Sequence, residues 1–206
     1  MRPDDAATLL DWKRRIFSLY AAVRADDAPE RAWRLWRQER DRMFAGHPQT
    51  PLAEGDPRRD SGLSYFDYDP GARVTGTVSA AEPKTYDIAT SGNGAYSFER
   101  FGSVTFTLGD ADLELELYWL AGYGGGLFLP FRDATAGSET YGAGRYLLDT
   151  IKGSDLGWEG DRIILDFNFA YNPSCSYDPR WVCPLAPPPN QLEVAIRAGE
   201  KHLERH

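Results

Sequence analysis

The distribution of glycine along the chain limits the possible folds most strongly. No glycine occurs in residues 1–45, whereas all 20 glycines of the 206-residue chain lie after that point. Glycine weakens helices and is frequent in the turns between strands. The sequence therefore predicts a helical N-terminal arm over residues 1–60 and a β-rich body over residues 61–206. We expect the arm to pack on the body, so that the two parts form one folding unit.

Two helices are expected in the arm. Over residues 9–23, apolar side chains recur at spacings of three and four, which is typical of an amphipathic helix. A second helix is expected to begin near Asp27, because Asp27 and Glu30 have the spacing of a capping box. Gly46 is expected to end this second helix.

The body has the sequence pattern of an antiparallel sheet. From residue 73 to residue 170, short segments of alternating apolar and polar residues are separated by Gly, Asn, Asp and Pro. The clearest segment runs from Leu113 to Trp119, with leucines and Trp119 expected on one buried face. No helical pattern separates the expected strands, which excludes parallel strands joined by helices. A short C-terminal helix is expected over residues 190–199.

These patterns together predict an α+β fold. The expected architecture is a mostly antiparallel β-barrel or β-sandwich, with an N-terminal two-helix arm and a short C-terminal helix. With 23 Lys and Arg against 31 Asp and Glu, the net charge is −8, which disfavours binding to nucleic acid. No run of 18 apolar residues occurs, and the N-terminus lacks the apolar core of a signal peptide. We therefore expect a cytoplasmic protein that does not bind membranes.

Several common catalytic motifs are missing from the sequence. The three histidines are His47, His202 and His206, so a histidine metal site or a Ser-His-Asp triad would depend on His47 alone. No G-x-S-x-G motif occurs. The glycine-rich run 122–126 is not followed by the Gly-Lys-Ser/Thr of a phosphate-binding loop. We therefore expect neither a metal nor a cofactor.

The two cysteines allow more than one interpretation. Cys175 and Cys183 lie in a segment rich in Pro, Ser and Tyr, with seven residues between them. Two thiols cannot complete a four-ligand zinc site alone, and the spacing differs from that of a C-x-x-C redox pair. They are reduced structural thiols, a disulfide that closes a nine-residue loop, or thiols with a metal or redox role. The sequence leaves these three possibilities open.

Two segments, residues 131–146 and 166–173, combine polar side chains with aromatic neighbours. We expect their polar groups to converge in one pocket, where the guanidinium of Arg145 would suit a carboxylate or phosphate of a ligand. The candidate ligand-binding residues are Asp133, Thr135, Glu139, Tyr141, Arg145, Asp166, Asn168 and Tyr171.

The same segments carry a resemblance to a known family. The chain resembles the bacterial and archaeal family called domain of unknown function 1684, from about Trp33 to Lys201. Longer members carry an additional N-terminal β segment that this chain lacks, so residues 62–66 are expected to join the arm directly to the shared body. The resemblance implies no reaction, cofactor or catalytic residue. It rests on these motifs: Phe131-x-Asp133-x-Thr135-x-Gly137-x-x-Thr140-Tyr141-x-x-Gly144-Arg145, Asp166-Phe167-Asn168-x-Ala170-Tyr171-Asn172-Pro173-x-Cys175, Cys183-Pro184-Leu185, Asn190-x-Leu192 and Ala198-Gly199-Glu200-Lys201.

Three functional interpretations remain. The first is a β-barrel that binds a small molecule, with a negatively charged ligand favoured by Arg145. The second is a metal-independent enzyme in which Asp133, Glu139 or Asp166 acts as a base and Tyr141 as an acid. The third is a purely structural or protein-interaction domain, in which an ion pair between Arg145 and Asp166 would connect two strands. A protein partner or a homo-oligomer is compatible with each of them.

Overall fold

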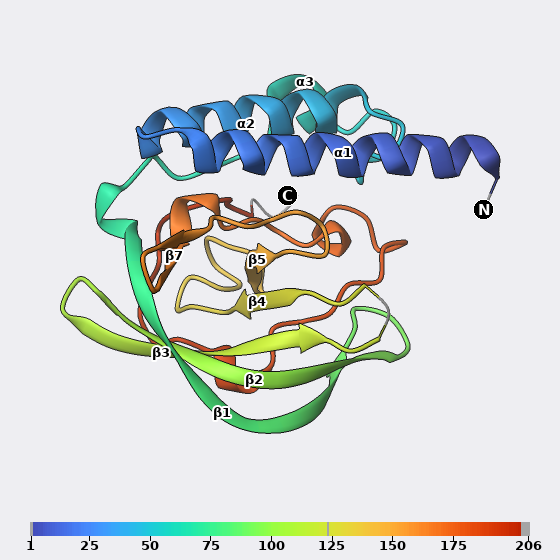
Figure 1. Ribbon diagram of the computed structural model, residues 1–206. Helices are drawn as coiled ribbons and strands as arrows, with labels where there is room; N and C mark the ends of the chain where they lie inside the picture. Colours follow the sequence, from blue (N-terminus) through green and yellow to red (C-terminus); the bar gives the residue numbers. More distant parts are fainter. Residues whose placement is uncertain (1, 123, 203–206) are drawn as a thin grey trace.

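The N-terminal arm forms helices. The computed structural model describes residues 2–122 and 124–202, and Figure 1 shows their arrangement. The arm contains α1 (Pro3–Ala25), α2 (Pro29–Gly46) and the short α3 (Arg58–Ser61). Helix α2 begins at Pro29, two residues after the expected start. Ala28 flanks it, and the backbone N–H of Ala28 donates to Asp26 Oδ1 at 2.8 Å. The two long N-terminal helices are thus confirmed.

The body is a mostly antiparallel sheet, as predicted. The described residues form a seven-stranded sheet in the order β5-β4-β3-β2-β1-β7-β6, and every pair of neighbouring strands is antiparallel. The sheet is strongly curved, and α1 and α2 lie side by side over it, with β1 to β3 on the far side (Figure 1). The strands are β1 (Arg73–Ala89), β2 (Ala95–Leu108), β3 (Ala111–Leu120), β4 (Leu127–Phe131), β5 (Arg145–Asp149), β6 (Trp158–Glu159) and β7 (Arg162–Asp166).

The prediction of a barrel is wrong, because the sheet stays open. Strands β5 and β6 stand at the two ends of the strand order, and no ladder joins them within the described residues. A single antiparallel bridge links Tyr146 of β5 to Tyr171, which follows β7 by five residues. The chain leaves the sheet before this point, in the 3₁₀ turn η2 (Phe167–Phe169). This turn interrupts the pairing that a closed barrel would need.

The predicted C-terminal helix is also wrong. The chain forms a short 3₁₀ turn, η4 (Pro188–Asn190), and the described residues after it contain no helix. Backbone groups of this segment pair with distant parts of the chain: Leu192 N–H donates to Arg132 C=O at 2.8 Å, and Glu200 N–H donates to Ala170 C=O at 2.8 Å. These groups are therefore not available for the bonds between residues four apart that a helix requires.

Strand β3 departs from its predicted alternation at one end. Leu115 and Leu117 are fully buried, as expected, but Trp119 is 47% exposed and Tyr118 is fully buried. Tyr118 belongs to a second aromatic cluster, which also contains Phe98, Phe128 and Tyr146. At this end the face that carries Tyr118 is therefore buried and the face that carries Trp119 is partly exposed, which removes the simple contrast between a dry and a wet face.

The arm and the sheet share one hydrophobic core. Trp33 and Trp36 of α2 belong to the same buried cluster as Val104 of β2 and Leu115 of β3. Trp36 packs edge to face against Phe169, with ring centroids 5.3 Å apart. Within the described residues, the structure contains no helix that is both long and apolar enough to cross a membrane.

Candidate functional site

The main cavity lies where the helical arm meets one end of the sheet. Its volume is about 510 Å³, a size at which proteins enclose small molecules. The walls come from α1, α2, strands β2 to β5 and the segment 171–184. Most of the lining is apolar and aromatic, with side chains that include Trp12, Tyr20, Phe44, Phe128, Tyr146 and Tyr171.

Three lining residues carry polar atoms without a hydrogen-bond partner in the described part of the chain. The atoms without a partner are Oδ1 of Asp149, Oδ1 of Asn172 and Nε1 of Trp181. Asp149 ends strand β5 and is 2% exposed, and its other oxygen lies 3.3 Å from Nζ of Lys152. Asn172 is 3% exposed. A buried polar atom without a partner costs free energy, so these three atoms need an explanation.

Other polar groups at the cavity are bonded to one another. Tyr20 Oη accepts hydrogen bonds from Trp36 Nε1 at 3.1 Å and from Ser154 Oγ at 3.0 Å. Burial raises the pKa of Tyr20, so this hydroxyl stays protonated near neutral pH. Arg40 forms an ion pair with Glu200 at 2.8 Å, and the two side chains are 7% and 2% exposed. These groups hold the walls in place.

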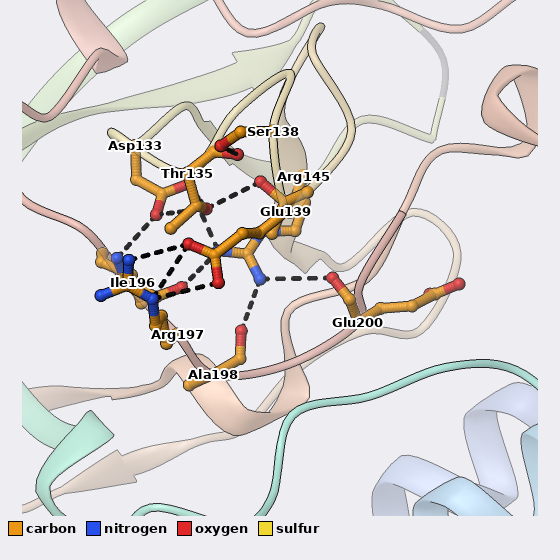
Figure 2. Close-up of polar contacts among 10 residues, drawn as sticks. Asp133, Thr135, Ser138, Glu139, Arg145, Ile196, Arg197, Ala198 and Glu200 are labelled. Atoms are coloured by element: carbon orange, nitrogen blue, oxygen red, sulfur yellow. Dashed lines mark hydrogen bonds and ion pairs between the residues drawn. The ribbon is translucent and has the colours of Figure 1, made fainter. Parts of the chain in front are cut away.

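Arg145 and Asp133 form a buried network that includes the C-terminal segment (Figure 2). The Arg145 guanidinium lies 3.4 Å from Asp133 Oδ1 and donates to the carbonyls of Ile196, at 3.0 Å, and Ala198. Asp133 Oδ2 accepts from Thr135 Oγ1 at 2.8 Å and from the Ile196 N–H at 2.7 Å. Burial lowers the pKa of Arg145, and Asp133 opposes that shift. These contacts occupy Asp133 and the two terminal nitrogens of Arg145 with the protein's own groups, whereas Nε of Arg145 has no hydrogen-bond partner in the described residues.

Glu139 and Tyr141 lie nearer the surface. The carboxylate of Glu139 forms an exposed ion pair with Arg197 at 2.8 Å, and this contact lowers the pKa of Glu139 (Figure 2). Tyr141 is half-buried, and its hydroxyl lies 3.9 Å from the sulfur of Cys175.

Asp166 and Asn168 belong to a separate buried network. Asp166 Oδ1 accepts from the backbone N–H and the side-chain amide of Asn168, at 3.0 and 2.8 Å. The side-chain amide of Asn168 also accepts from the N–H of Asp69 and donates to its carbonyl. Nε of Arg73 lies 3.8 Å from Oδ2 of Asp166. Burial raises the pKa of Asp166 to about 6, against the opposing effects of Asn168 and Arg73. The expected ion pair between Arg145 and Asp166 is thus replaced by pairs with Asp133 and Arg73.

Of the eight residues predicted from the sequence, Tyr171 lines the cavity. Asp133, Thr135 and Arg145 are brought together, and Asp166 and Asn168 are brought together, but the two groups have different partners. Asp149 and Asn172 were not among the residues predicted to line a pocket. Asn172 had a detectable signal, because it adjoins Tyr171.

No metal-binding cluster is visible in the described residues: they contain no group of three or more His, Cys, Asp and Glu side chains that could hold a metal ion. The three carboxylates considered as bases also face different partners. Asp133 faces Arg145, Glu139 faces Arg197 and Asp166 faces Asn168.

Comparison with known proteins finds a family match and a similar solved structure. A family model described as "Protein of unknown function (DUF1684)" matches residues 60–201. The chain is similar to an uncharacterised protein from gene locus rrnAC0354 of Haloarcula marismortui, whose structure was determined in solution by NMR. The two are 38% identical with a TM-score of 0.61, and the match covers 84% of this chain and 93% of the other. No curated protein matches the chain.

Proposed function

The chain belongs to the DUF1684 family of proteins of unknown function, and from the geometry of its cavity we propose that it binds a small amphipathic molecule there. The observation that carries the proposal is the combination of an aromatic cavity of about 510 Å³ with the three partnerless polar atoms of Asp149, Asn172 and Trp181 in its wall. An apolar body would displace water from the aromatic walls, and a polar group would orient it.

The polar atoms indicate which group the ligand carries. The free oxygens of Asp149 and Asn172 are hydrogen-bond acceptors, so they suit a hydroxyl, amine or amide N–H of the ligand. Trp181 Nε1 is a donor and suits an oxygen on the same molecule. Lys13 and Lys152 also line the cavity, and Lys13 would accommodate a negative charge on the ligand, whereas Lys152 is paired with Asp149. The proposed ligand therefore has an apolar body and a hydrogen-bond donor, and an anionic group is compatible with it.

A thermal-shift screen tests this proposal. Compounds that share one aromatic body should be compared as alcohol, methyl ether and carboxylate. We expect the alcohol to raise the melting temperature more than its ether, because the ether cannot donate to Asp149 or Asn172. At a ligand concentration of about 100 Kd, binding adds roughly 2.7 kcal/mol, which is a rise of roughly 5–10 °C for a chain of this size.

A variant that fills the cavity provides the control. Ser174 lines the cavity, so Ser174→Leu should reduce the shift that the alcohol produces. Ser79, which is exposed on β1, gives the matched change Ser79→Leu and should leave the shift unaltered. Equal shifts in the wild type and in Ser174→Leu would place binding elsewhere and refute the proposal.

A further inference from the structure

Both cysteines lie in the segment that forms one wall of the cavity, and their thiols are in contact. Cys175 lies in the 3₁₀ turn η3 (Ser174–Ser176), and Cys183 lines the cavity itself. The two thiols lie close enough for each to shift the pKa of the other, and both cysteines are free. Cys183 is 4% exposed, whereas Cys175 is only partly buried. A small oxidant or alkylating agent can therefore reach Cys175 more readily than Cys183.

The groups around Cys175 favour its thiolate form. The adjacent Cys183 thiol, together with nearby hydroxyls, lowers the pKa of Cys175 to about 6 against the opposing effect of burial. The hydroxyl of Tyr141 lies 3.9 Å from the Cys175 sulfur. Burial and the adjacent thiolate raise the pKa of Tyr141 to about 12, so Tyr141 keeps its proton and donates it. The adjacent Cys175 raises the pKa of Cys183, which holds its proton.

The backbone of Cys183 is held close to the end of strand β1. The N–H of Cys183 donates to Ser91 Oγ at 3.1 Å, and the N–H of Ser91 donates to the Cys183 carbonyl at 2.9 Å. The Ser91 hydroxyl also lies 3.1 Å from the Trp181 carbonyl, so its single proton is shared between this oxygen and the Cys175 sulfur. Ser91, which lies outside the segment 175–183, thus holds the backbone of Cys183 in place.

We propose that Cys175 and Cys183 form a reactive dithiol, in which Cys175 attacks a hydroperoxide and Cys183 converts the product to an internal disulfide. The Cys175 sulfur bonds to the terminal peroxide oxygen, the O–O bond breaks, and the leaving alkoxide takes a proton from water. Cys183 then gives up its proton and bonds to the Cys175 sulfur, and the hydroxyl of the sulfenic acid leaves as water. Overall, two thiols and one hydroperoxide give one disulfide, one alcohol and one water, and the thiols lose two electrons.

This inference goes beyond ligand binding and does not depend on it. The arrangement of the groups assigns different tasks to the two cysteines: the accessible Cys175 reacts first and the buried Cys183 second. Because Cys183 lines the cavity, the disulfide also changes the wall against which a ligand would pack.

The first experiment measures the thiol reactivity of the folded, full-length chain. The reduced protein is alkylated with iodoacetamide across a range of pH, and the two cysteines are followed separately by peptide mass spectrometry. Cys175 should reach half its maximal rate near pH 6, whereas an ordinary thiol does so near pH 8.5, and Cys183 should stay protected. Equal rates for both cysteines with a midpoint near pH 8.5 would overturn the proposal.

The second experiment follows oxidation by one equivalent of hydrogen peroxide. The wild-type chain should lose two hydrogens in mass and yield a peptide linked through Cys175 and Cys183. Cys183→Ser should accumulate a sulfenic acid at Cys175, which dimedone traps, and Cys175→Ser should react slowly. An intermolecular disulfide as the main product would overturn the proposal, as would oxidation that starts at Cys183.

A tyrosine pair separates the role of the hydroxyl from general effects on folding. Tyr141→Phe removes a donor to the Cys175 sulfur, so it should move the alkylation midpoint to higher pH and slow the reaction with peroxide. Tyr68→Phe is the matched control, because Tyr68 packs against Trp33 instead, with ring centroids 5.5 Å apart. It should leave both measurements unchanged. The same midpoint in Tyr141→Phe and in the wild type would refute the contribution of this hydroxyl.

Discussion

The ion pair between Arg145 and Asp133 is shielded from water, because each side chain is 1% exposed. Arg145 also donates to three carbonyls of the C-terminal segment, and Asp133 accepts a hydrogen bond from the backbone N–H of Ile196. A buried pair of this kind adds little net stability, because desolvation offsets the attraction between the charges. The loss of one partner is nevertheless costly, since it leaves the other charge buried alone.

At this residue scale, we predict a large effect from Arg145→Met. The substitution keeps most of the side-chain volume but leaves the Asp133 carboxylate without its cation, so the free energy of unfolding should fall by roughly 3–5 kcal/mol. The added change Asp133→Asn should recover part of the loss, and urea unfolding of the two variants measures both effects. Arg197→Ala, in the exposed pair with Glu139, is the control and should change little. Equal losses in Arg145→Met and Arg197→Ala would contradict this account.

At the scale of elements, the C-terminal segment is held by its close approach to the turn after β7. Gly199 has φ of +78°, and a Cβ atom at this position would lie 2.6 Å from the Ala170 carbonyl oxygen and 2.7 Å from that of Phe167. Its own carbonyl accepts from Phe66 N–H at 3.0 Å. The segment therefore depends on a glycine both for its backbone conformation and for the absence of a side chain.

Gly199→Ala should lower the free energy of unfolding by roughly 2–4 kcal/mol, through strain at positive φ and overlap with two backbone carbonyls. Gly109→Ala is the matched control. Gly109 also has positive φ, +59°, but a Cβ atom there would have no neighbour within 4 Å in the described structure. Only the strain remains, so the loss should be roughly 1–2 kcal/mol. Thermal unfolding of both variants measures the difference, and a loss in Gly199→Ala no larger than in Gly109→Ala would show that the close approach costs nothing.

Elements whose partners are adjacent in the chain were predictable from the sequence. The turn at Gly109 joins β2 to β3, and the alternation of Leu113, Leu115 and Leu117 indicated the buried face of β3. The segment 190–199 has helical spacing, but its backbone bonds go to Arg132, Ala134 and Phe66. A local pattern does not contain such distant partners, and for this reason the helix prediction failed.

The candidate site was less predictable than the strands for the same reason. The polar residues of the two segments were expected to converge in one pocket. In the structure, Arg145 pairs with Asp133 within the first segment, and Asn168 pairs with Asp166 within the second. The cavity instead combines α1, α2, β5 and the segment 171–184. Asp149 could be identified only from the structure, because the relevant observation is that its Oδ1 has no hydrogen-bond partner in the described residues.

At the scale of the whole molecule, the helices complete the core of the sheet. Trp33 and Trp36 are 5% and 0% exposed, and Trp33 Nε1 donates to the Asn168 carbonyl at 3.1 Å. Without the arm, the cluster that contains Val104 and Leu115 would face water. That the arm and body form one folding unit stays a prediction.

Removal of residues 1–46 tests it directly. The loss of a buried tryptophan costs about 3–5 kcal/mol, and a domain has about 5–15 kcal/mol in total, so the remaining chain should not unfold cooperatively. Circular dichroism during heating and the dispersion of amide NMR signals measure the outcome. Removal of residues 1–7, which precede the first expected core contacts, is the control and should preserve the transition. A cooperative transition in the shorter chain would show that the body folds alone.

The open sheet has one further consequence, for contacts between different molecules. Unpaired backbone groups at a sheet edge can recruit a strand from another chain, which leads to aggregation. At one edge, all five residues of β5 are buried, and Tyr146 is bridged to Tyr171. At the other edge, β6 is only two residues long, and its Glu159 forms an ion pair with Arg73 at 2.6 Å. These two end strands therefore offer little template for the addition of a foreign strand. Strand β1 is different, because it pairs with β7 only from Arg73 to Gly76, and within the described residues no ladder covers this edge from Thr77 to Ala89, so we expect a foreign strand to add there.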